Sequence, residues 1–523
     1  MAIKKLKKKT NLPTMKTKIN SYIKKRKPNI KNLMANVAIT LLCVALLASC
    51  KVGKNYERPN FDGVSDAFYV KDSVLNDSLA EASVMRDSLL MSSIPWSDFI
   101  QDSTLVALID TALVNNIELQ KAMRNMDIGL EYLAQSKANF LPSVNATPAG
   151  FRREYYSENY NNYGSNRARR NHGENPPTSL YTERLEYTSA LQANWEVDIW
   201  GKLSWQKEAA RADFMKSEEF KKLIQTELIA EVASTYYNLV MLQSQVEVAQ
   251  KNYALNDSTF NIIKLQYDAG ETTSLALQQT KSQQLKAKSL IPQLERQYTV
   301  QENKLNRLLG RSPRPIKLNV DFDEIEFQKR YKTGIPLELI KNRPDVAMAE
   351  YQLIAQNART GVAEALKYPS LSIGAGLGLN SMDLSNFLDP VSSAFALLNG
   401  SIFQPIFNNR KLKTNYRVAL TEREIAQLEF KDNLISAIED VSNSLTRINK
   451  LKEEYKIAQE RIEVTQKGLK DAALLFRGGF ANYLEVITAQ SDALESELNE
   501  INTKKKILIA NIELYRSLGG GWK

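Results

Sequence analysis

Two uninterrupted helical stretches dominate the hydrophobic pattern of the chain. Residues 200–267 contain no proline and only one glycine, Gly201, and residues 409–476 form a second stretch of the same length. At a rise of 1.5 Å per residue, each stretch would extend about 100 Å as a helix. Helices of globular domains seldom exceed about 25 residues, so the pattern predicts a coiled coil or a helical barrel.

Apolar positions in the second stretch recur in steps of three and four residues. Near its end the predicted seam comprises Tyr455, Ala458, Ile462, Thr465, Leu469, Ala472 and Phe476. Beyond a glycine turn it comprises Leu484, Ile487, Ser491, Leu494, Leu498, Ile501, Lys505, Leu508, Ile512 and Tyr515. A mean step of about 3.5 residues predicts left-handed packing. The polar members Ser491 and Lys505 favour a helical wall with one face toward water over a dry two-stranded coil.

Four shorter segments have the pattern of strands. They cover residues 141–149, 185–199, 370–379 and 393–407. Pro142 and Pro369 mark the change from helix to strand, because proline interrupts a helix but fits the first position of a strand. The segments have the length of about ten residues that a tilted membrane strand requires.

The same plan occurs twice along the chain: helix, strand, loop, strand, long helix, glycine turn and long helix. The turn at 267–270 is repeated at 476–479, an offset of 209 residues, and Leu275 corresponds to Leu484 at the same offset. Pro142 corresponds to Pro369 at an offset of 227. These near-constant offsets predict an internal duplication. The first copy carries roughly 20 extra residues, which we assign to an extracellular loop at 155–177.

The amino terminus has the features of a secretory signal, and Met1, Met15 or Met34 could start it. Residues 1–33 hold 12 positive charges and no acid, and the apolar stretch 37–49 follows. That stretch is shorter than the roughly 20 residues of a spanning helix. Without residues 1–33 the formal charge of +10 becomes −2, so the basic pI gives no reason to expect nucleic-acid binding.

Cys50 ends the sequence Leu47-Ala48-Ser49-Cys50, directly after the apolar stretch. This order is typical of a lipoprotein signal, in which the cysteine thiol receives a diacylglyceryl group and the cysteine becomes the new amino terminus. The alternative is a chance cysteine near an ordinary cleavage site. We predict a mature chain that begins at a lipidated Cys50, anchored by two or more acyl chains and without a disulfide.

No group of residues indicates catalytic or metal-binding chemistry. His172 is the only histidine, and it lies in the polar segment 155–177. Because no second His or Cys is available to help it bind a metal, we interpret it as a loop residue. The sequence has no phosphate-binding loop, so energy for transport has to come from a partner. We therefore predict no enzyme activity, no metal and no cofactor.

Glycines mark the predicted turns. Gly201 begins the first long helix, and Gly270 and Gly479 end the two long helices, with Gly478 beside Gly479. We expect a positive φ at Gly201, Gly270 and Gly479, because glycine adopts this conformation without steric cost.

From residue 50 to residue 523 the chain resembles outer-membrane factors of the TolC/OprM/NodT type. The motifs that carry the resemblance are Cys50–Pro59, the spaced run from Trp96 to Asn116, Trp195–Lys202, Tyr267–Gly270, Arg343–Val346 and Tyr515–Trp522. The resemblance implies a fold that is mainly α with membrane β: a TolC-like trimeric α/β barrel of two structural repeats. Each protomer would give four strands and long coiled-coil helices.

This interpretation divides the chain into six parts. They are a signal peptide (1–49), a lipidated amino-terminal segment (50–100), a first repeat (101–310), an equatorial connector (311–334), a second repeat (335–518) and a tail (519–523).

The resemblance also implies a function and a gate. The protein would be the outer-membrane exit duct of a tripartite efflux system, a homotrimer surrounded by outer-membrane lipid. A periplasmic adaptor and an inner-membrane RND-type pump would dock at its helix tips. Leu484 matches the family's constricting leucine, whereas Thr488 stands where an aspartate is typical. Asp268 and Arg477 are further gate or docking candidates beside Gly270, Gly478 and Gly479, with ordinary surface charge as the alternative.

Three alternatives stay open at this point. A duct for type I protein secretion or metal export would have the same architecture. A periplasmic adaptor lipoprotein would carry one helical hairpin and many short strands. A structural coiled-coil lipoprotein would not need the proline-bounded strands.

Overall fold

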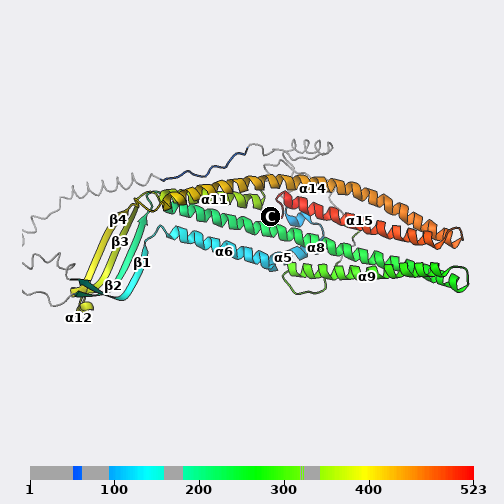
Figure 1. The fold of residues 1–523 in the computed structure, drawn as a ribbon, viewed down its shortest axis with the longest axis horizontal. Coiled ribbons are helices and arrows are strands. Elements are labelled where there is room, and N and C mark those ends of the chain that lie inside the picture. The colour runs from blue at the N-terminus through cyan, green and yellow to red at the C-terminus, as the bar shows by residue number, and fades with distance from the viewer. Residues whose placement is uncertain are drawn as a thin grey trace, which may run out of the picture. The chain divides into compact units, whose positions relative to one another are not determined.

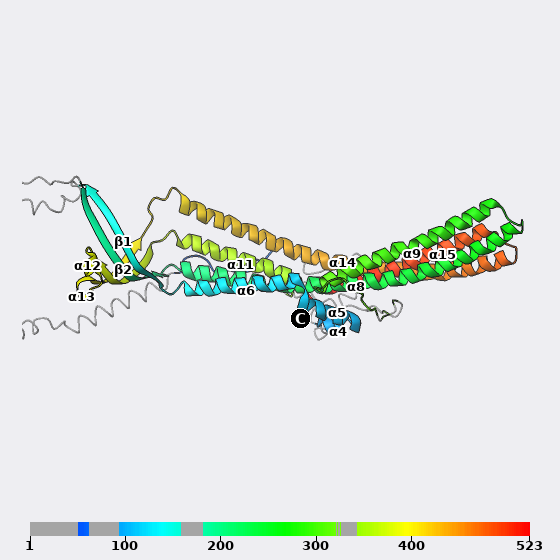
Figure 2. The same ribbon diagram turned by 90° about the horizontal axis from the view of Figure 1, so that it is seen from below.

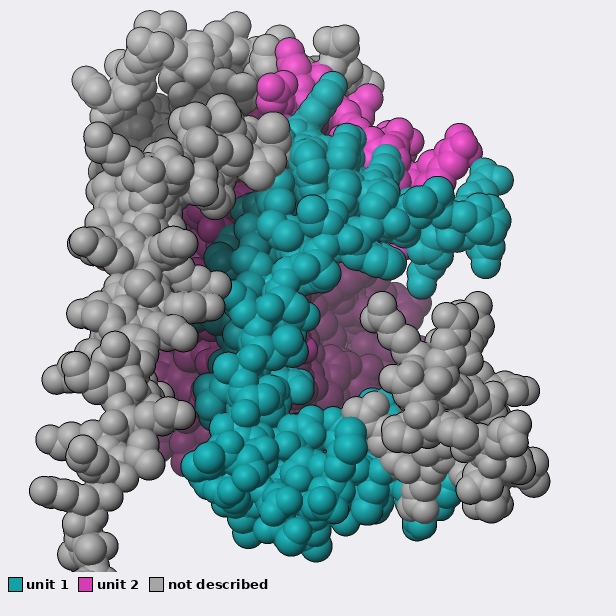
Figure 3. Space-filling model, turned by 90° about the vertical axis from the view of Figure 1, so that its left-hand side faces the viewer, with its two compact units in different colours: residues 1–54, 139–204, 361–412 teal, residues 55–138, 205–360, 413–523 magenta. Residues whose placement is uncertain are grey.

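The computed structural model describes residues 51–61, 94–157, 181–318, 320, 322, 325 and 342–522. Cys50, His172, the signal segment and most of the predicted 155–177 loop lie outside these residues. The chain forms two compact units (Figure 3). Unit 1 comprises residues 1–54, 139–204 and 361–412, and unit 2 comprises residues 55–138, 205–360 and 413–523. Both repeats contribute to each unit.

Unit 1 contains a four-stranded sheet in the order β1-β2-β3-β4 (Figure 1). The strands are β1 (Ser143–Ser157), β2 (Tyr181–Val197), β3 (Ser370–Ser381) and β4 (Ala394–Phe403), with the short helices α12 (Leu384–Phe387) and α13 (Pro390–Ser393) between the last two. All three pairings are antiparallel: Ser143 faces Asn194, Trp195 faces Ile373, and Ile373 faces Gly400. β1 and β4 therefore form the edges of the sheet.

The four predicted strands are confirmed, although their limits differ from the prediction. β1 extends into the predicted loop and β2 begins four residues before its predicted start, because the ladder between them continues to the pairs Tyr155–Glu183 and Ser157–Tyr181. β4 ends at Phe403 rather than at residue 407. The cause is local, since Pro405 has no N–H to donate to a ladder.

The helices reproduce the predicted duplication. α8 (Lys202–Asp268) and α14 (Lys411–Arg477) have 67 residues each, and α9 (Ser274–Leu308) and α15 (Tyr483–Ser517) have 35 each. Every pair of corresponding ends differs by 209 residues. α6 (Ile117–Ala138) and α11 (Pro344–Ala365) have 22 residues each and differ by 227. Before them lie α4 (Trp96–Phe99) and α5 (Ser103–Asn115).

Side-chain caps set several helix starts. Asp102 accepts from the N–H groups of Thr104 and Leu105 at the start of α5. Thr273 accepts from Ala276 N at the start of α9, and Asn482 accepts from the first free N–H groups of α15. These oxygens satisfy donors that have no partner inside the helix. In the described part of the chain, no helix combines the length and the apolar character that a membrane span requires.

The predicted seam holds in α14 and, for every member except Leu484, in α15. All seven predicted members between Tyr455 and Phe476 are buried or partly buried. In the first half of α15 the predicted members after Leu484 are partly buried, and Leu484 itself is exposed. The fully buried side chains here belong to Val486, Gln490, Ala493 and Ser496. The heptad pattern identified the period correctly, but it missed the most deeply buried positions, because small and polar residues occupy them.

Candidate functional site

The two glycine turns of unit 2 have the same geometry. Figures 1 and 2 show the α8–α9 and α14–α15 turns at the same end of this unit. Gly270 and Gly479 have φ values of 79° and 76°, which confirms the prediction for them, and Gly201 follows with 76°. In each turn the residue after the glycine donates its N–H five residues back: Glu271 to Gln266 O at 2.8 Å and Phe480 to Leu475 O at 2.9 Å. This pattern is the Schellman helix end.

The tip turns, defined as residues 265–275 and 474–484, carry exposed apolar side chains. These are Leu265, Tyr267, Leu275, Leu474, Leu475, Phe480 and Leu484. A Cβ at Gly270 or Gly479 would meet nothing within 4 Å, so φ alone demands glycine there. Gly478 differs, because a Cβ at this position would come within 3.1 Å of the Phe480 ring. The tips are thus narrow turns with apolar flanks.

The charged candidates at the tips are exposed. Asp268 and Arg477 form no ion pair within the described residues of one protomer. Because the two positions correspond at an offset of 209, one tip carries an acid where the other carries a base. Glu271 and Phe480 are related in the same way. The two tip turns therefore have the same backbone conformation but carry different charges.

Leu484 lies in the first turn of α15, where its N–H donates to the Asn482 side chain at 2.9 Å. Its side chain is 52% exposed, and that of its repeat counterpart Leu275 is 63% exposed. Thr488, one turn later, is exposed as well. The side chains of Leu484 and Thr488 are not buried within the protomer, so both can contact other copies of the chain.

Behind the tips, polar residues link α15 to the other long helices. The Gln490 side-chain nitrogen donates to Thr259 of α8 at 2.9 Å, and the backbone carbonyl of Gln490 accepts from Asn252 at 3.4 Å. Thr465 of α14 and Ser496 share a hydrogen bond of 2.7 Å. The Gln490 side-chain oxygen is buried without a partner. Sequence reasoning missed this layer, although a glutamine among apolar heptad positions is the signal that could have found it.

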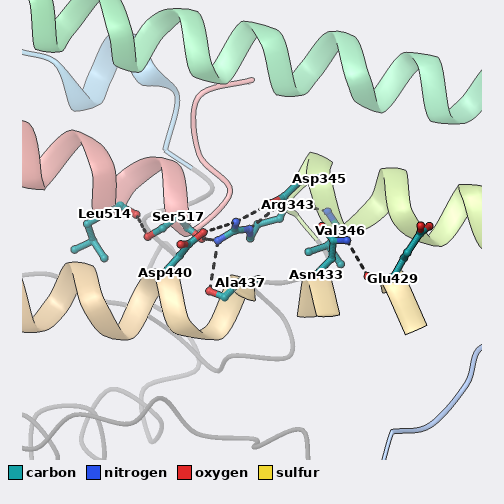
Figure 4. A network of polar contacts seen from close by, with 9 residues as sticks. All are labelled: Arg343, Asp345, Val346, Glu429, Asn433, Ala437, Asp440, Leu514 and Ser517. Carbon is teal, nitrogen blue, oxygen red and sulfur yellow. Dashed lines mark hydrogen bonds and ion pairs between the residues drawn. The ribbon is translucent and has the colours of Figure 1, made fainter. Parts of the chain in front are cut away.

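A second polar cluster, around Arg343, joins three helices of unit 2 (Figure 4). Arg343 is buried directly before α11 and contacts Asp345 at 2.7 Å and Asp440 of α14 at 2.9 Å. It also donates to the carbonyl of Ser517, the last residue of α15, at 3.0 Å. In the sequence the Arg343–Val346 motif was identified only through the family resemblance. Its contacts could not be predicted, because Asp440 and Ser517 lie 97 and 174 residues away from Arg343.

The cluster perturbs its ionisable groups. Burial would lower the pKa of Arg343, but the hydrogen bonds and charges of Asp345 and Asp440 outweigh it and raise the pKa. Burial would raise the pKa of Asp345, but the hydrogen bond and charge of Arg343 lower it. Both groups are therefore held in their charged forms.

The described residues contain no group of three or more His, Cys, Asp or Glu side chains that could hold a metal ion. The other polar sites have structural partners. Burial and the neighbouring Asp102 raise the pKa of Tyr236, which donates to that carboxylate. Burial raises the pKa of Tyr515 to about 12, and its hydroxyl donates to Ile94 O at 2.6 Å.

Known proteins match this chain over most of its length. The family model described as outer membrane efflux protein matches residues 108–311 and 335–520. The cation efflux system protein CusC of Escherichia coli is 25% identical over 483 residues, covering 92% of this chain and 98% of that protein. The toluene efflux pump outer membrane protein TtgC of Pseudomonas putida is 26% identical, covering 80% of this chain and 83% of TtgC.

A solved structure agrees with the fold. The open-state MtrE outer membrane channel of Neisseria gonorrhoeae superimposes with a TM-score of 0.76 at 24% identity, covering 91% of this chain and 99% of MtrE. The expected architecture, mainly α with a four-stranded sheet and a TolC-like plan, is confirmed. Because the family model matches both of these segments, it favours an efflux channel over the adaptor and coiled-coil alternatives. This chain belongs to the outer membrane efflux protein family, whose members are channels of the outer membrane.

Proposed function

We propose that this chain is one protomer of a homotrimeric exit duct in the outer membrane. The duct is a passive conduit for small molecules and not an enzyme. The observation that carries the proposal is the sheet, whose edge strands β1 and β4 have no partner within the described residues. A strand in a bilayer cannot leave its backbone groups unpaired. Three copies, with β4 of each beside β1 of the next, would close a barrel wide enough for a pore.

The mass of the purified protein in detergent tests the assembly. A trimer that forms ion-conducting pores in a planar bilayer is the expected result. A monodisperse monomer with its helical content intact would contradict the trimer. Pores without a trimer would contradict the barrel closure, because the four strands of one chain cannot enclose a channel.

The driving energy comes from partners that dock at the tips. An inner-membrane RND-type pump and its periplasmic adaptor would meet the exposed apolar side chains of the tip turns, including Leu474, Leu475 and Phe480. Exposed apolar patches of this kind mark interaction sites. The difference between Asp268 and Arg477 gives each tip its own charge, so an adaptor would meet two related but unequal surfaces.

We propose that Leu484 forms the gate of the duct. Three exposed leucines meeting around the trimer axis would form a narrow apolar ring, and such a ring blocks ions by dewetting. Thr488 adds no charge to this ring. Asp268 and Arg477 lie in the tip turns that flank it and would contribute only exposed ion pairs between neighbours, worth about 0–1 kcal/mol each.

Export of small organic molecules is the substrate class that we favour, and the match to CusC supports export of metal cations as the second candidate. Deleting the gene and measuring growth inhibition separates them. Hypersensitivity to solvents and antibiotics is expected under the first hypothesis, whereas hypersensitivity to metal salts alone would favour the second. A type I protein-secretion duct would leave both unchanged and abolish an exported protein.

The mature chain is held at the membrane through Cys50. The thiol sulfur bonds the diacylglyceryl group of a phospholipid, the S–H proton is lost and the headgroup phosphate leaves. Hydrolysis of the Ser49–Cys50 peptide bond then frees the new amino terminus. The intact mass of the mature protein tests this step. Cys50→Ser should slow targeting without changing conductance, since the barrel itself spans the bilayer.

A further inference from the structure

Unit 1 contains a cavity that the efflux function does not use. It has a volume of about 750 Å³, within the range of small-molecule sites. Three crossings between sheet and helix line it: the turn from β2 to α8, the turn from α11 to β3, and the segment from β4 to α14. Trp200 forms a fixed wall, because its ring stacks on Tyr368 at 5.0 Å and its Nε1 donates to Pro369 O at 2.7 Å.

The charged side chains of the cavity have partners within the protein. Glu196 pairs with Lys202 at 2.6 Å. The two carboxylate oxygens of Asp198 accept from the backbone of Leu203 and Ser204, both at 2.9 Å, at the start of α8. Gln404 donates to Lys367 O at 3.1 Å and to Pro405 O at 3.2 Å. The apolar side chains at the open end of the cavity are exposed to water: Ile406 is 96% exposed and Phe407 is 87% exposed. The cavity therefore suits a hydrocarbon ligand better than a charged one.

The amino-terminal segment is fastened to the same place. Val52 donates its N–H to Trp200 O at 3.2 Å. Lys51 lies against Gly201, where an added Cβ would come within 2.7 Å of the lysine Cγ. Gly201 is thus required both by its φ of 76° and by the passage of Lys51. Cys50 directly precedes Lys51, and Lys51 contacts Gly201, which lies between the lining residues Trp200 and Lys202.

We propose that an acyl chain carried by Cys50 occupies this cavity. The inference rests on the proposed lipidation of Cys50. It assigns one acyl chain of the anchor a binding site on the protein, with Ile406 and Phe407 covered by hydrocarbon, while the remaining acyl chains hold the protein in the bilayer. Because Cys50 is bonded to Lys51 and Val52 is hydrogen-bonded to Trp200, the chain connection keeps an acyl group on Cys50 within reach of the cavity. Docking of this kind fixes where the chain enters the membrane relative to the ends of the strands.

Photocrosslinking in cells tests the proposal. Cells grown on a diazirine-bearing palmitate are irradiated, and the full-length protein is purified and digested. The expected product is a peptide containing residues 403–407 or 365–370 joined to the Cys50 peptide. The same peptides joined to a free phospholipid would overturn the proposal in favour of a bilayer lipid. Absence of label at both segments would overturn it in favour of cover by a second copy.

A matched pair of variants separates docking from general damage. Gly201→Ala strains a positive φ and pushes Lys51 away, whereas Gly270→Ala strains an equal φ with nothing within 4 Å. We expect the joined peptide to fall several-fold in Gly201→Ala and to stay at the wild-type level in Gly270→Ala. Equal yields in all three proteins would overturn the proposal.

The intact mass of the mature protein distinguishes a failure of the proposed lipidation from a failure of the proposed acyl-chain site. A mature chain without lipid would remove the anchor and this site together and leave the channel function untouched. A lipidated chain whose crosslinks map to the strand faces at Leu377 and Leu398 would overturn the site alone.

Discussion

Asn116 and Arg343 occupy equivalent positions in the two repeats and make the same hydrogen bond. Each directly precedes a short helix, α6 or α11, and each donates to a carbonyl at the end of the returning long helix. Asn116 Nδ2 reaches Leu308 O at 2.9 Å, and Arg343 Nη1 reaches Ser517 O at 3.0 Å. The donors differ by 227 residues and the acceptors by 209, as the helices do. The joint is neutral in the first repeat and ionic in the second.

Breaking the ionic joint should destabilise the protein more than breaking the neutral one. Arg343→Met removes two carbonyl hydrogen bonds, to Ser517 O and Ala437 O, and contacts with two carboxylates, and it leaves two partly buried acids unpaired. We expect a loss of about 3 kcal/mol in the free energy of unfolding. Asn116→Ala loses the bond to Leu308 and the cap on Leu119, and should cost about 1–2 kcal/mol. Urea denaturation in detergent measures both, and equal losses would show that the carboxylates contribute nothing.

Acid should remove the advantage of Arg343. Burial opposes the charge of Asp345, but Arg343 outweighs it and lowers the pKa of that carboxyl. A depressed pKa contributes stability that is present above the unfolded value of about 4 and is lost as the pH falls through the folded pKa. The difference in Tm between wild type and Arg343→Met should therefore be largest at pH 6 and shrink below pH 4. A difference that grows on acidification would reverse the assigned sign.

The hydrophobic period of the sequence predicted the long helices, but it could not predict the hydrogen bonds that join their ends. The long helices begin and end within two residues of the predicted stretches, because proline and glycine punctuate them. The ladder between Tyr155 and Glu183 was missed, since pairing across a hairpin can extend a strand into polar sequence. The bond from Arg343 to Ser517 depends on the fold bringing residues 174 apart together, and no local pattern records that.

The buried oxygen of Gln490 should be a point of weakness in the tip hairpins. It lies in the interior of α15 without a partner, which costs about 1–3 kcal/mol. Gln490→Met keeps the length of the side chain and removes the orphan acceptor together with the bond to Thr259. Because Thr259 still donates to Leu255 O, we expect a net gain of about 1 kcal/mol and a higher Tm by circular dichroism. A loss of stability would mean that the bond to Thr259 outweighs the orphan oxygen.

The proposed gate makes the sharpest prediction, because the repeat supplies its own control. Leu484 and Leu275 are related by the offset of 209, and both are exposed in the first turn of a long helix. If three copies of Leu484 close the duct as an apolar ring, Leu484→Ser should wet the constriction and raise single-channel conductance. Leu275→Ser should remove a similar exposed leucine and leave conductance near the wild-type value.

Removing the charge of Arg477 tests the alternative hypothesis, that ion pairs close the gate. Arg477→Ala would remove an exposed ion pair worth at most about 1 kcal/mol, so it should open the duct less than Leu484→Ser does. Antibiotic uptake by intact cells should follow the conductance, while the trimer mass stays unchanged in all three variants. If Leu484→Ser left conductance unaltered and Arg477→Ala raised it sharply, closure would be ionic. If Leu275→Ser matched Leu484→Ser, the constriction would be shared by both hairpins, and the leucine at the start of α15 would have no special place in it.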